Sequence, residues 1–226
     1  MRKTVIGNIL MLVLGVLTAQ MSAAQGTTTF LSNVGQTPDG SNPVASDSWL
    51  AEGFITGGNS GGYVLSSVQL GLAGASGNPS SFTVMIYSEG NSLGSIIPGG
   101  SIGTLTGSAN PASAGIYTYA APQDITLSPG TEYYIVITSG TMVANGAYSW
   151  NFLNTSAFQP QDGWGASVTL SSGNGSSWTR LGSSPNYDYS EFAINATPAP
   201  EPGVLGLFAL GGLLVALQRR KTRSVQ

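Results

Sequence analysis

The sequence predicts an all-β fold, an antiparallel β-sandwich with a jelly-roll-like arrangement of strands. Glycine accounts for 32 of the 226 residues and charged residues for only 8%, which is unlike a helical bundle or a charge-rich disordered chain. Aromatic and β-branched residues recur throughout, and no helical period runs through the body. Because a chain of many short strands must stack or close its sheets to avoid open edges, two packed sheets are expected.

Nine short runs carry the strand pattern, separated by clusters of Gly, Pro, Asn and Ser. In 81–88, "SFTVMIYS", apolar positions alternate with Thr, Met and Tyr, which is typical of a strand buried largely on both faces, and 131–138 is similar. Pro129-Gly130 predicts the turn directly before 131–138. The nine expected strands are 63–72, 81–88, 101–105, 116–120, 131–138, 147–153, 166–170, 177–181 and 190–196.

Residues 1–24 have the three parts of a secretory signal peptide. Arg2 and Lys3 precede an apolar stretch at 5–17, and the small residues Ser22-Ala23-Ala24 follow at cleavage spacing. The alternative is an N-terminal membrane anchor, but a helix over 5–17 would be roughly 20 Å long, shorter than the ~30 Å hydrocarbon core. We therefore expect a signal helix, cleavage after Ala24, and export across the inner membrane.

The C-terminus carries a second apolar stretch, 203–217, which contains no charge and lies between Pro202 and a basic tail at 219–223. At roughly 22 Å a helix over this stretch is marginal for spanning a bilayer. Basic residues after a membrane helix favour the cytoplasmic side, so the body would lie outside and the tail inside.

The order of these parts resembles the PEP-CTERM sorting signal of Gram-negative bacteria. Pro200, Glu201 and Pro202 come first, the Gly/Leu-rich apolar helix follows, and Arg219, Arg220 and Lys221 close the pattern. The resemblance implies recognition by an exosortase, a membrane-embedded transpeptidase, with release or transfer of the body near the motif. Such signals accompany exopolysaccharide production and biofilm formation. An ordinary C-terminal anchor is the alternative, although an anchor needs no Pro-Glu-Pro.

Three segments follow from these assignments: a signal peptide at 1–24, a body at 25–197, and a sorting or anchor segment at 198–226 whose first residues form an extended spacer. The body resembles the choice-of-anchor R domain between Ser48 and Ala196, in stretches such as "AEGFITGG", "SFTVMIYSEG" and "SEFAINA". This resemblance implies a fold and a surface-attached setting, and it supplies no catalytic residue.

Charge and residue types exclude several functions. Between Gln25 and Pro202 lie ten acidic residues and one basic residue, Arg180, a formal charge of −9. Nucleic acid and anionic membrane surfaces are therefore not expected partners. The chain has no His and no Cys, which removes Ser-His-Asp and Cys-His catalysis and the commonest zinc ligands. The sequence indicates no catalytic residue, no cofactor and no metal site.

Two alternatives remain for the carboxylates. A glycosidase needs only two carboxylates across a cleft, but the acidic residues are scattered singly. Calcium bound through Asp162, Asp188 or Glu191 is the other alternative. No Asp-x-Asp-x-Asp-Gly loop is present, and capping of turns by Asp is the more frequent role.

Four aromatic residues in turn-rich stretches are the candidates for ligand binding: Trp164, Trp178, Tyr187 and Tyr189. A flat ring beside amide and carboxylate groups suits a sugar, whose C–H face stacks on the ring. The alternative is that these rings close the ends of the sandwich.

The sequence therefore predicts a noncatalytic, exported protein of the cell surface or extracellular matrix, held in the membrane by its C-terminal helix transiently or permanently. Association with extracellular polysaccharide is expected. A specific carbohydrate-binding module is the first alternative, and a polysaccharide-active enzyme the second.

Overall fold

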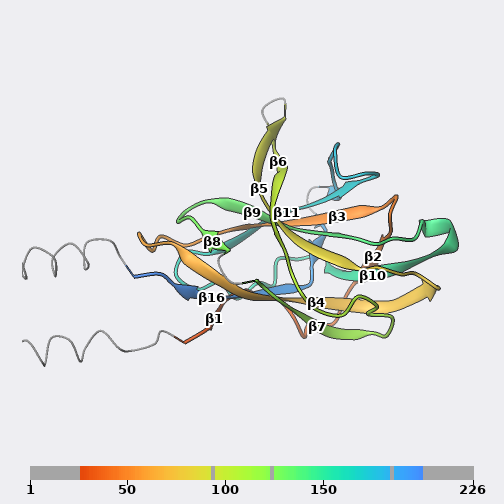
Figure 1. Ribbon diagram of the computed structural model, residues 1–226, viewed down its shortest axis with the longest axis horizontal. Coiled ribbons are helices and arrows are strands. Elements are labelled where there is room, and N and C mark those ends of the chain that lie inside the picture. The colour runs from red at the N-terminus through yellow and green to blue at the C-terminus, as the bar shows by residue number, and fades with distance from the viewer. Residues whose placement is uncertain (1–25, 93–94, 123–124, 184–185, 201–226) are drawn as a thin grey trace, which may run out of the picture.

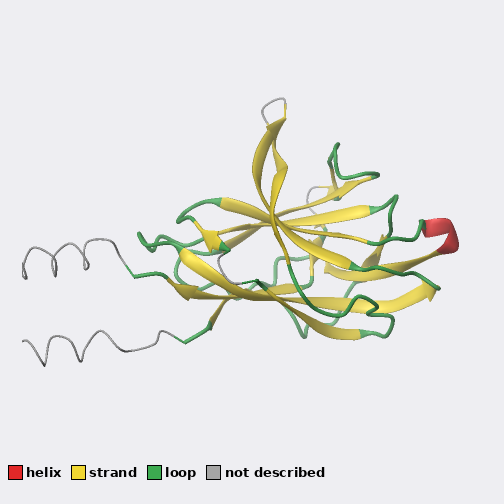
Figure 2. Ribbon diagram, in the orientation of Figure 1, coloured by secondary structure: helices red, strands yellow, loops and turns green. Residues whose placement is uncertain are grey.

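The body of the protein is a sandwich of two antiparallel β-sheets, as predicted (Figures 1 and 2). The structure, a computed structural model, describes residues 26–92, 95–122, 125–183 and 186–200. The eight-stranded sheet contains β1 (Thr28–Ser32), β2 (Gly40–Val44), β4 (Tyr63–Gly77), β7 (Gly115–Ala120), β8 (Thr126–Leu127), β10 (Gly146–Leu153), β15 (Tyr189–Ser190) and β16 (Phe192–Pro198). The six-stranded sheet contains β3 (Trp49–Ile55), β5 (Thr83–Ser92), β6 (Ser95–Thr104), β9 (Glu132–Thr138), β11 (Gly165–Ser172) and β12 (Thr179–Arg180).

The chain passes repeatedly from one sheet to the other. The eight-stranded sheet runs β1-β16-β4-β10-β15, with β2 on β10 and with β7 and β8 on β4. The six-stranded sheet runs β12-β11-β3-β9-β5-β6. A small hairpin, β13 (Gly182–Ser183) with β14 (Asn186–Tyr187), and a 3-10 helix, η2 (Val143–Asn145), complete the named elements. The jelly-roll-like arrangement of these strands stays a prediction.

The first three strands, β1 to β3, were absent from the nine expected runs. β2 reads "GSNPV", which has turn residues in place of a β-prone pattern. Pro43 is tolerated there because β2 is an edge strand, which pairs with β10 and with no other described strand. β3 reads "WLAEGFI", in which Glu52 and Gly53 interrupt the apolar run.

The main core fills the space between the sheets. Alternate residues of each strand face inward, for example Leu50 and Phe54 of β3 and Ile135 and Ile137 of β9. The intervening residues of the six-stranded sheet form a second, smaller apolar cluster on its outer face, with Ala51, Tyr134, Val136 and Leu170 buried. β9 is thus buried on both faces, which confirms the prediction made for 131–138.

The two ends of the body lie side by side, because Thr28 of β1 pairs with Ala196 of β16 (Figure 1). β16 ends at Pro198, and Ala199 remains tied to the loop before β4. Its amide donates to the Gly62 carbonyl at 2.9 Å, and its own carbonyl accepts from Asn59 Nδ2 at 3.0 Å. The predicted spacer therefore begins as part of the folded body.

The predicted terminal helices lie outside the described residues, as do Glu201, Pro202, Arg219, Arg220 and Lys221. Pro200 is the last described residue and is exposed. In the described part of the chain, no helix has the length and apolar content that spanning a membrane requires.

Candidate functional site

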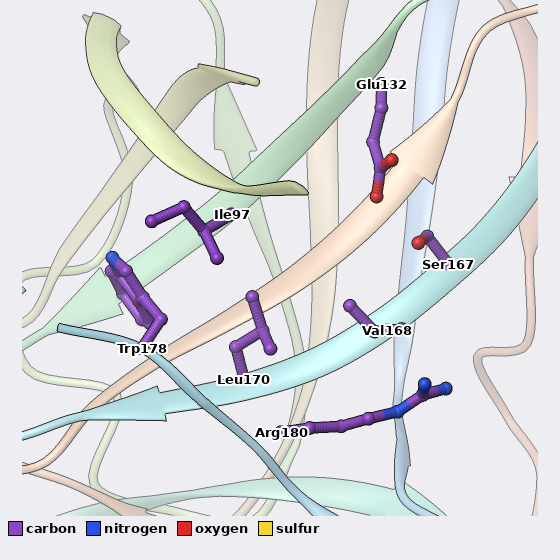
Figure 3. Close-up of a pocket in the computed structure, with 7 residues that line it drawn as sticks. All are labelled: Ile97, Glu132, Ser167, Val168, Leu170, Trp178 and Arg180. Atoms are coloured by element: carbon purple, nitrogen blue, oxygen red, sulfur yellow. The ribbon is translucent and has the colours of Figure 1, made fainter. Parts of the chain in front are cut away.

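A pocket of about 430 Å³ lies on the outer face of the six-stranded sheet (Figure 3). Four strands or their flanking loops supply its lining: Ile97, Glu132, Ser167, Val168, Leu170, Trp178 and Arg180. In the view of Figure 3, Ile97 and Trp178 lie toward one end, and Glu132 and Ser167 toward the other. The pocket therefore combines an apolar, aromatic end with a polar end.

A β-bulge in β11 shapes the floor of the pocket. Ala166 pairs with Phe54 and Thr169 with Glu52, so Ser167 and Val168 together oppose one residue of β3. A bulge of this kind leaves an extra residue unpaired and re-aims side chains. Ser167 and Val168 both line the pocket as a result.

The loop after β11 positions Trp178. The Ser172 hydroxyl accepts the Gly175 amide at 2.9 Å, and Asn174 Oδ1 accepts the Ser176 amide at 3.1 Å. Gly175 has a φ of 77° and packs so closely on Trp49 that a Cβ would lie 2.8 Å from ring carbons. Only glycine suits this backbone conformation and this approach. The loop is therefore fixed over the outer face directly before Trp178.

Arg180 is the only basic residue in the described part of the chain. Its guanidinium carbon lies 3.9 Å from the centre of the Tyr187 ring, a cation–π contact. No described carboxylate pairs with it, and its N–H groups make no hydrogen bond with any described residue. An exposed guanidinium, supported from one side by a ring, is thus available at the pocket.

Glu132 supplies the carboxylate of the pocket. Its Oε1 accepts a hydrogen bond from the Tyr134 hydroxyl at 3.0 Å. Burial raises the pKa of the Tyr134 phenol, and the neighbouring Glu132 charge raises it further. The Tyr134 hydroxyl therefore keeps its proton and remains a donor. The bond holds the Glu132 side chain, whose carboxylate Figure 3 shows directed toward Ser167.

Two of the four predicted aromatic residues come together at this site: Trp178 lines the pocket, and Tyr187 supports Arg180. Tyr189 does not join them. It belongs to β15 in the eight-stranded sheet, where its ring contacts Phe158 with centres 6.1 Å apart. Tyr187 and Tyr189 diverge because they lie in strands of different sheets.

The prediction of Trp164 as a ligand-binding residue is wrong, because its side chain is only 3% exposed. Its ring stacks between Phe30 and Phe54, with centres 5.0 and 6.0 Å away, and Tyr63 packs edge-on at 4.9 Å. A Cβ on Gly57 would lie 2.9 Å from Trp164 Cδ1, so the loop after β3 also covers it. Trp164 closes the end of the sandwich, which was the alternative interpretation, and no ligand reaches its ring without opening the core.

Two of the three carboxylates considered for calcium accept hydrogen bonds within the fold. Asp188 Oδ2 accepts from Asn42 Nδ2 at 3.1 Å, and Glu191 accepts from the Gly35 amide and from Asn151 Nδ2 at 2.7 and 2.9 Å. Asp162 lies in a turn with a positive φ of 49°. Among the residues that the structure describes, no three carboxylates gather in a way that would hold a metal ion.

Glu52 is a buried carboxyl group that joins the two sheets. Its Oε2 accepts the amide of Ser190 in β15 at 3.0 Å and lies against the hydroxyl of Thr169 in β11. Its Oε1 has no hydrogen-bond partner among the described residues. Burial raises the pKa of Glu52 to about 7, and the bonds to Thr169 and Ser190 oppose this rise only in part.

Thr169 connects Glu52 to the segment directly before β15. Thr169 Oγ1 lies within hydrogen-bond distance of both Glu52 Oε2 and the Asp188 carbonyl oxygen. The carbonyl can only accept, and a threonine hydroxyl has one hydrogen. The Thr169 hydroxyl is therefore a single donor that serves two acceptors, Glu52 Oε2 and the Asp188 carbonyl oxygen.

Sequence reasoning missed five residues that line the pocket, namely Ile97, Glu132, Ser167, Val168 and Leu170, and noted Arg180 only as a charge. One signal in the sequence was not used: residues two apart in a strand share a face, which would have placed Trp178 and Arg180 on the same side. The partners from β6 and β9 are distant in sequence and offered no such signal, whereas β11 is the strand directly before β12 and pairs with it.

No protein-family model matches this chain, and no curated protein is significantly similar to it in sequence. The geometry of the pocket is therefore the main guide to the chemistry of the body.

Proposed function

We propose that the chain is an exported, noncatalytic protein of the cell surface or extracellular matrix, and that its body, 25–197, is a jelly-roll-like sandwich that binds extracellular polysaccharide. Its tail, 198–226, acts as a PEP-CTERM sorting segment recognised by an exosortase-type enzyme. The membrane contact is made by the apolar stretch 203–217 before processing.

The observation that carries the binding proposal is the pairing of aromatic and polar groups in one pocket. Trp178, Ile97 and Leu170 offer an apolar surface, and Glu132, Ser167 and Arg180 offer hydrogen-bonding groups. A sugar ring has an apolar C–H face and polar hydroxyls at its rim, which such a surface complements.

The carboxylates support a role without catalysis. Glycoside hydrolysis needs two carboxyl groups roughly 5 to 10 Å apart across the bond that is cut. Glu132 is the one carboxylate among the residues that line the pocket, and Glu52 is fully buried between the sheets. Binding is therefore the function that this arrangement supports better.

The placement of the pocket agrees with attachment through the tail. The tail continues from β16, which belongs to the eight-stranded sheet, and the pocket lies on the outer face of the other sheet. A body held at the end of β16 therefore leaves the pocket uncovered for a large polymer.

Replacement of Trp178 with alanine is expected to weaken saturable binding of the producing strain's exopolysaccharide about tenfold, or about 1.4 kcal/mol. The exported protein is titrated with the polysaccharide by calorimetry. Tyr189→Ala is the matched control, since this aromatic residue lies outside the pocket and should leave the affinity unchanged. Equal affinities for the wild type and Trp178→Ala would count against the pocket.

Changing Pro200, Glu201 and Pro202 together to alanine is expected to prevent removal of the tail. The intact mass of the wild-type exported protein should lack 1–24 and the residues after the motif, whereas the triple variant should retain its C-terminus. Pro198→Ala changes a proline outside the motif and should be processed normally. A wild-type protein that retains all residues to Gln226 would contradict the sorting proposal.

A further inference from the structure

We infer that the saccharide bound in this pocket carries a carboxylate, so that the polysaccharide is an acidic, uronate-containing polymer and Arg180 is the group that recognises its charge. The inference rests on the proposed function and adds the class of sugar.

The first observation is the position of the charge. Between Gln25 and Pro202 the chain has ten acidic residues and Arg180 as its one basic residue. This cation lines the pocket instead of lying elsewhere on the surface. A pocket for a neutral sugar needs hydrogen-bonding groups but no positive charge, and Glu132 and Ser167 already supply such groups.

The second observation is that Arg180 pairs with no carboxylate among the described residues. In an acidic body an exposed arginine readily meets a carboxylate, yet no described carboxylate lies within ion-pair distance of this guanidinium. Its N–H donors are also without hydrogen bonds to the described residues. Its charge and its donors therefore remain available to a ligand.

The third observation is that the guanidinium is held in place. Tyr187 lies against it at 3.9 Å, which leaves the N–H groups at its planar edge free. The spacing of guanidinium donors matches the two oxygens of a carboxylate, and a stacked guanidinium loses less freedom on binding than a mobile one. A planar carboxylate is thus the anion that this group suits.

The negative charge of the body opposes an anionic polymer only at long range. At an ionic strength of 0.1 M the screening length is about 10 Å, so distant carboxylates contribute little while a contact with Arg180 persists. Glu132 lies in the same pocket and repels an anion. In Figure 3, Ser167 and Val168 lie between Glu132 and Arg180, which leaves Glu132 to accept sugar hydroxyls.

The test compares the producing strain's exopolysaccharide with the same polymer after chemical reduction of its carboxylates to alcohols. The exported protein is titrated with both forms by calorimetry at 0.1 M salt. We expect the wild type to prefer the acidic form about tenfold. Arg180→Gln should remove the preference and bind both forms alike, and Trp178→Ala should weaken binding of both.

The control Gln159→Glu lowers the net charge by one, as Arg180→Gln does. Gln159 is exposed. Its backbone N–H donates to the carbonyl oxygen of Ser32 in β1, which belongs to the other sheet. This variant should keep the preference, which separates a contact at Arg180 from overall repulsion. Unchanged thermal unfolding of Arg180→Gln shows that the fold is retained.

Each other outcome is decisive. Equal binding of the two forms by the wild type, or binding to a polymer without uronic acid, overturns the inference and leaves the proposed function standing. A preference that survives in Arg180→Gln also overturns it. Absence of binding to both forms overturns the inference and the proposed function together.

Discussion

Replacing Trp164 with alanine is expected to lower the free energy of unfolding by about 3 to 5 kcal/mol, the usual range for deleting a buried aromatic ring. Phe30 and Phe54 stack on its two faces and Tyr63 packs on its edge, so the change leaves a cavity bordered by three rings. These rings come from β1, β3 and β4, which belong to both sheets. The lost packing therefore weakens the contact between the sheets.

Urea unfolding of the protein, extrapolated to water, measures this loss of stability. Trp178→Ala is the matched control, because Trp178 is only partly buried and should cost clearly less stability. The two variants should differ in the opposite sense in binding: under the proposed function, Trp164→Ala should keep its affinity for the polysaccharide while it is folded, and Trp178→Ala should have a weakened affinity. A Trp164→Ala protein that stays stable but no longer binds the polysaccharide would show that Trp164 belongs to the binding surface after all.

The contacts of Trp164 also predict the outcome of a smaller change. Its Nε1 is buried and has no hydrogen-bond partner among the described residues, so the indole contributes packing alone. Trp164→Phe therefore loses ring volume but no hydrogen bond, and it should be less destabilising than Trp164→Ala. Trp150 differs, because its Nε1 donates to the Glu191 carbonyl at 2.9 Å. Trp150→Phe should cost about 1 kcal/mol more than Trp164→Phe for that bond.

Glu52→Gln is expected to abolish a loss of stability of about 3 kcal/mol that the wild type shows between about pH 4.5 and pH 7. Burial raises the pKa of Glu52 from 4.5 to about 7 in the folded protein. In the unfolded chain the group is exposed to water and titrates near its ordinary value. Between these two values the folded state holds a proton that the unfolded state has released, so raising the pH favours unfolding.

The direction and the size of the stability change follow from the difference between the pKa values of Glu52 in the folded and unfolded states. The favourable contribution of Glu52 is complete below about pH 4.5 and is lost as the pH rises through about 7, and a difference of this size corresponds to about 3 kcal/mol. Glutamine cannot ionise, so the variant should be nearly flat over this range and more stable than the wild type above pH 7. Thermal or urea unfolding at a series of pH values measures both curves.

Glu89→Gln is the control, because Glu89 is an exposed carboxylate in the same sheet. It should leave the wild-type slope unchanged. A wild-type stability that rises through this pH range, or a Glu52→Gln variant with the same slope as the wild type, would show that Glu52 is ionised in the folded protein.

Several features of the fold were predictable because they depend on local pattern. Alternation in 131–138 placed Ile135 and Ile137 on one face and Tyr134 and Val136 on the other. Pro129-Gly130 indicated the turn before β9, where Gly130 has a positive φ of 59°. The same period also places Glu52 on the inward face with Leu50 and Phe54, a signal that its charge obscured.

The candidate site was only partly predictable. Trp178 and Tyr187 were named from their flanking residues, and both lie at the site. Trp164 was misjudged because neighbouring glycines indicate a turn but do not tell which distant rings cover it. Phe30 and Tyr63, which bury Trp164, are far from it in the chain and reach it only through the pairing of the strands.

The sequence by itself determined the class of fold and the acidic charge of the body with its lone cation, and the order of the parts at its two ends is what predicts export and sorting. Only the tertiary structure decided which side chains meet. Ala51 pairs with Leu170 and Glu52 with Thr169 because β3 and β11 are neighbours in a sheet although they are distant in sequence. Long-range strand pairing therefore buried Trp164 and Glu52, and it assembled Glu132, Trp178 and Arg180 into one pocket.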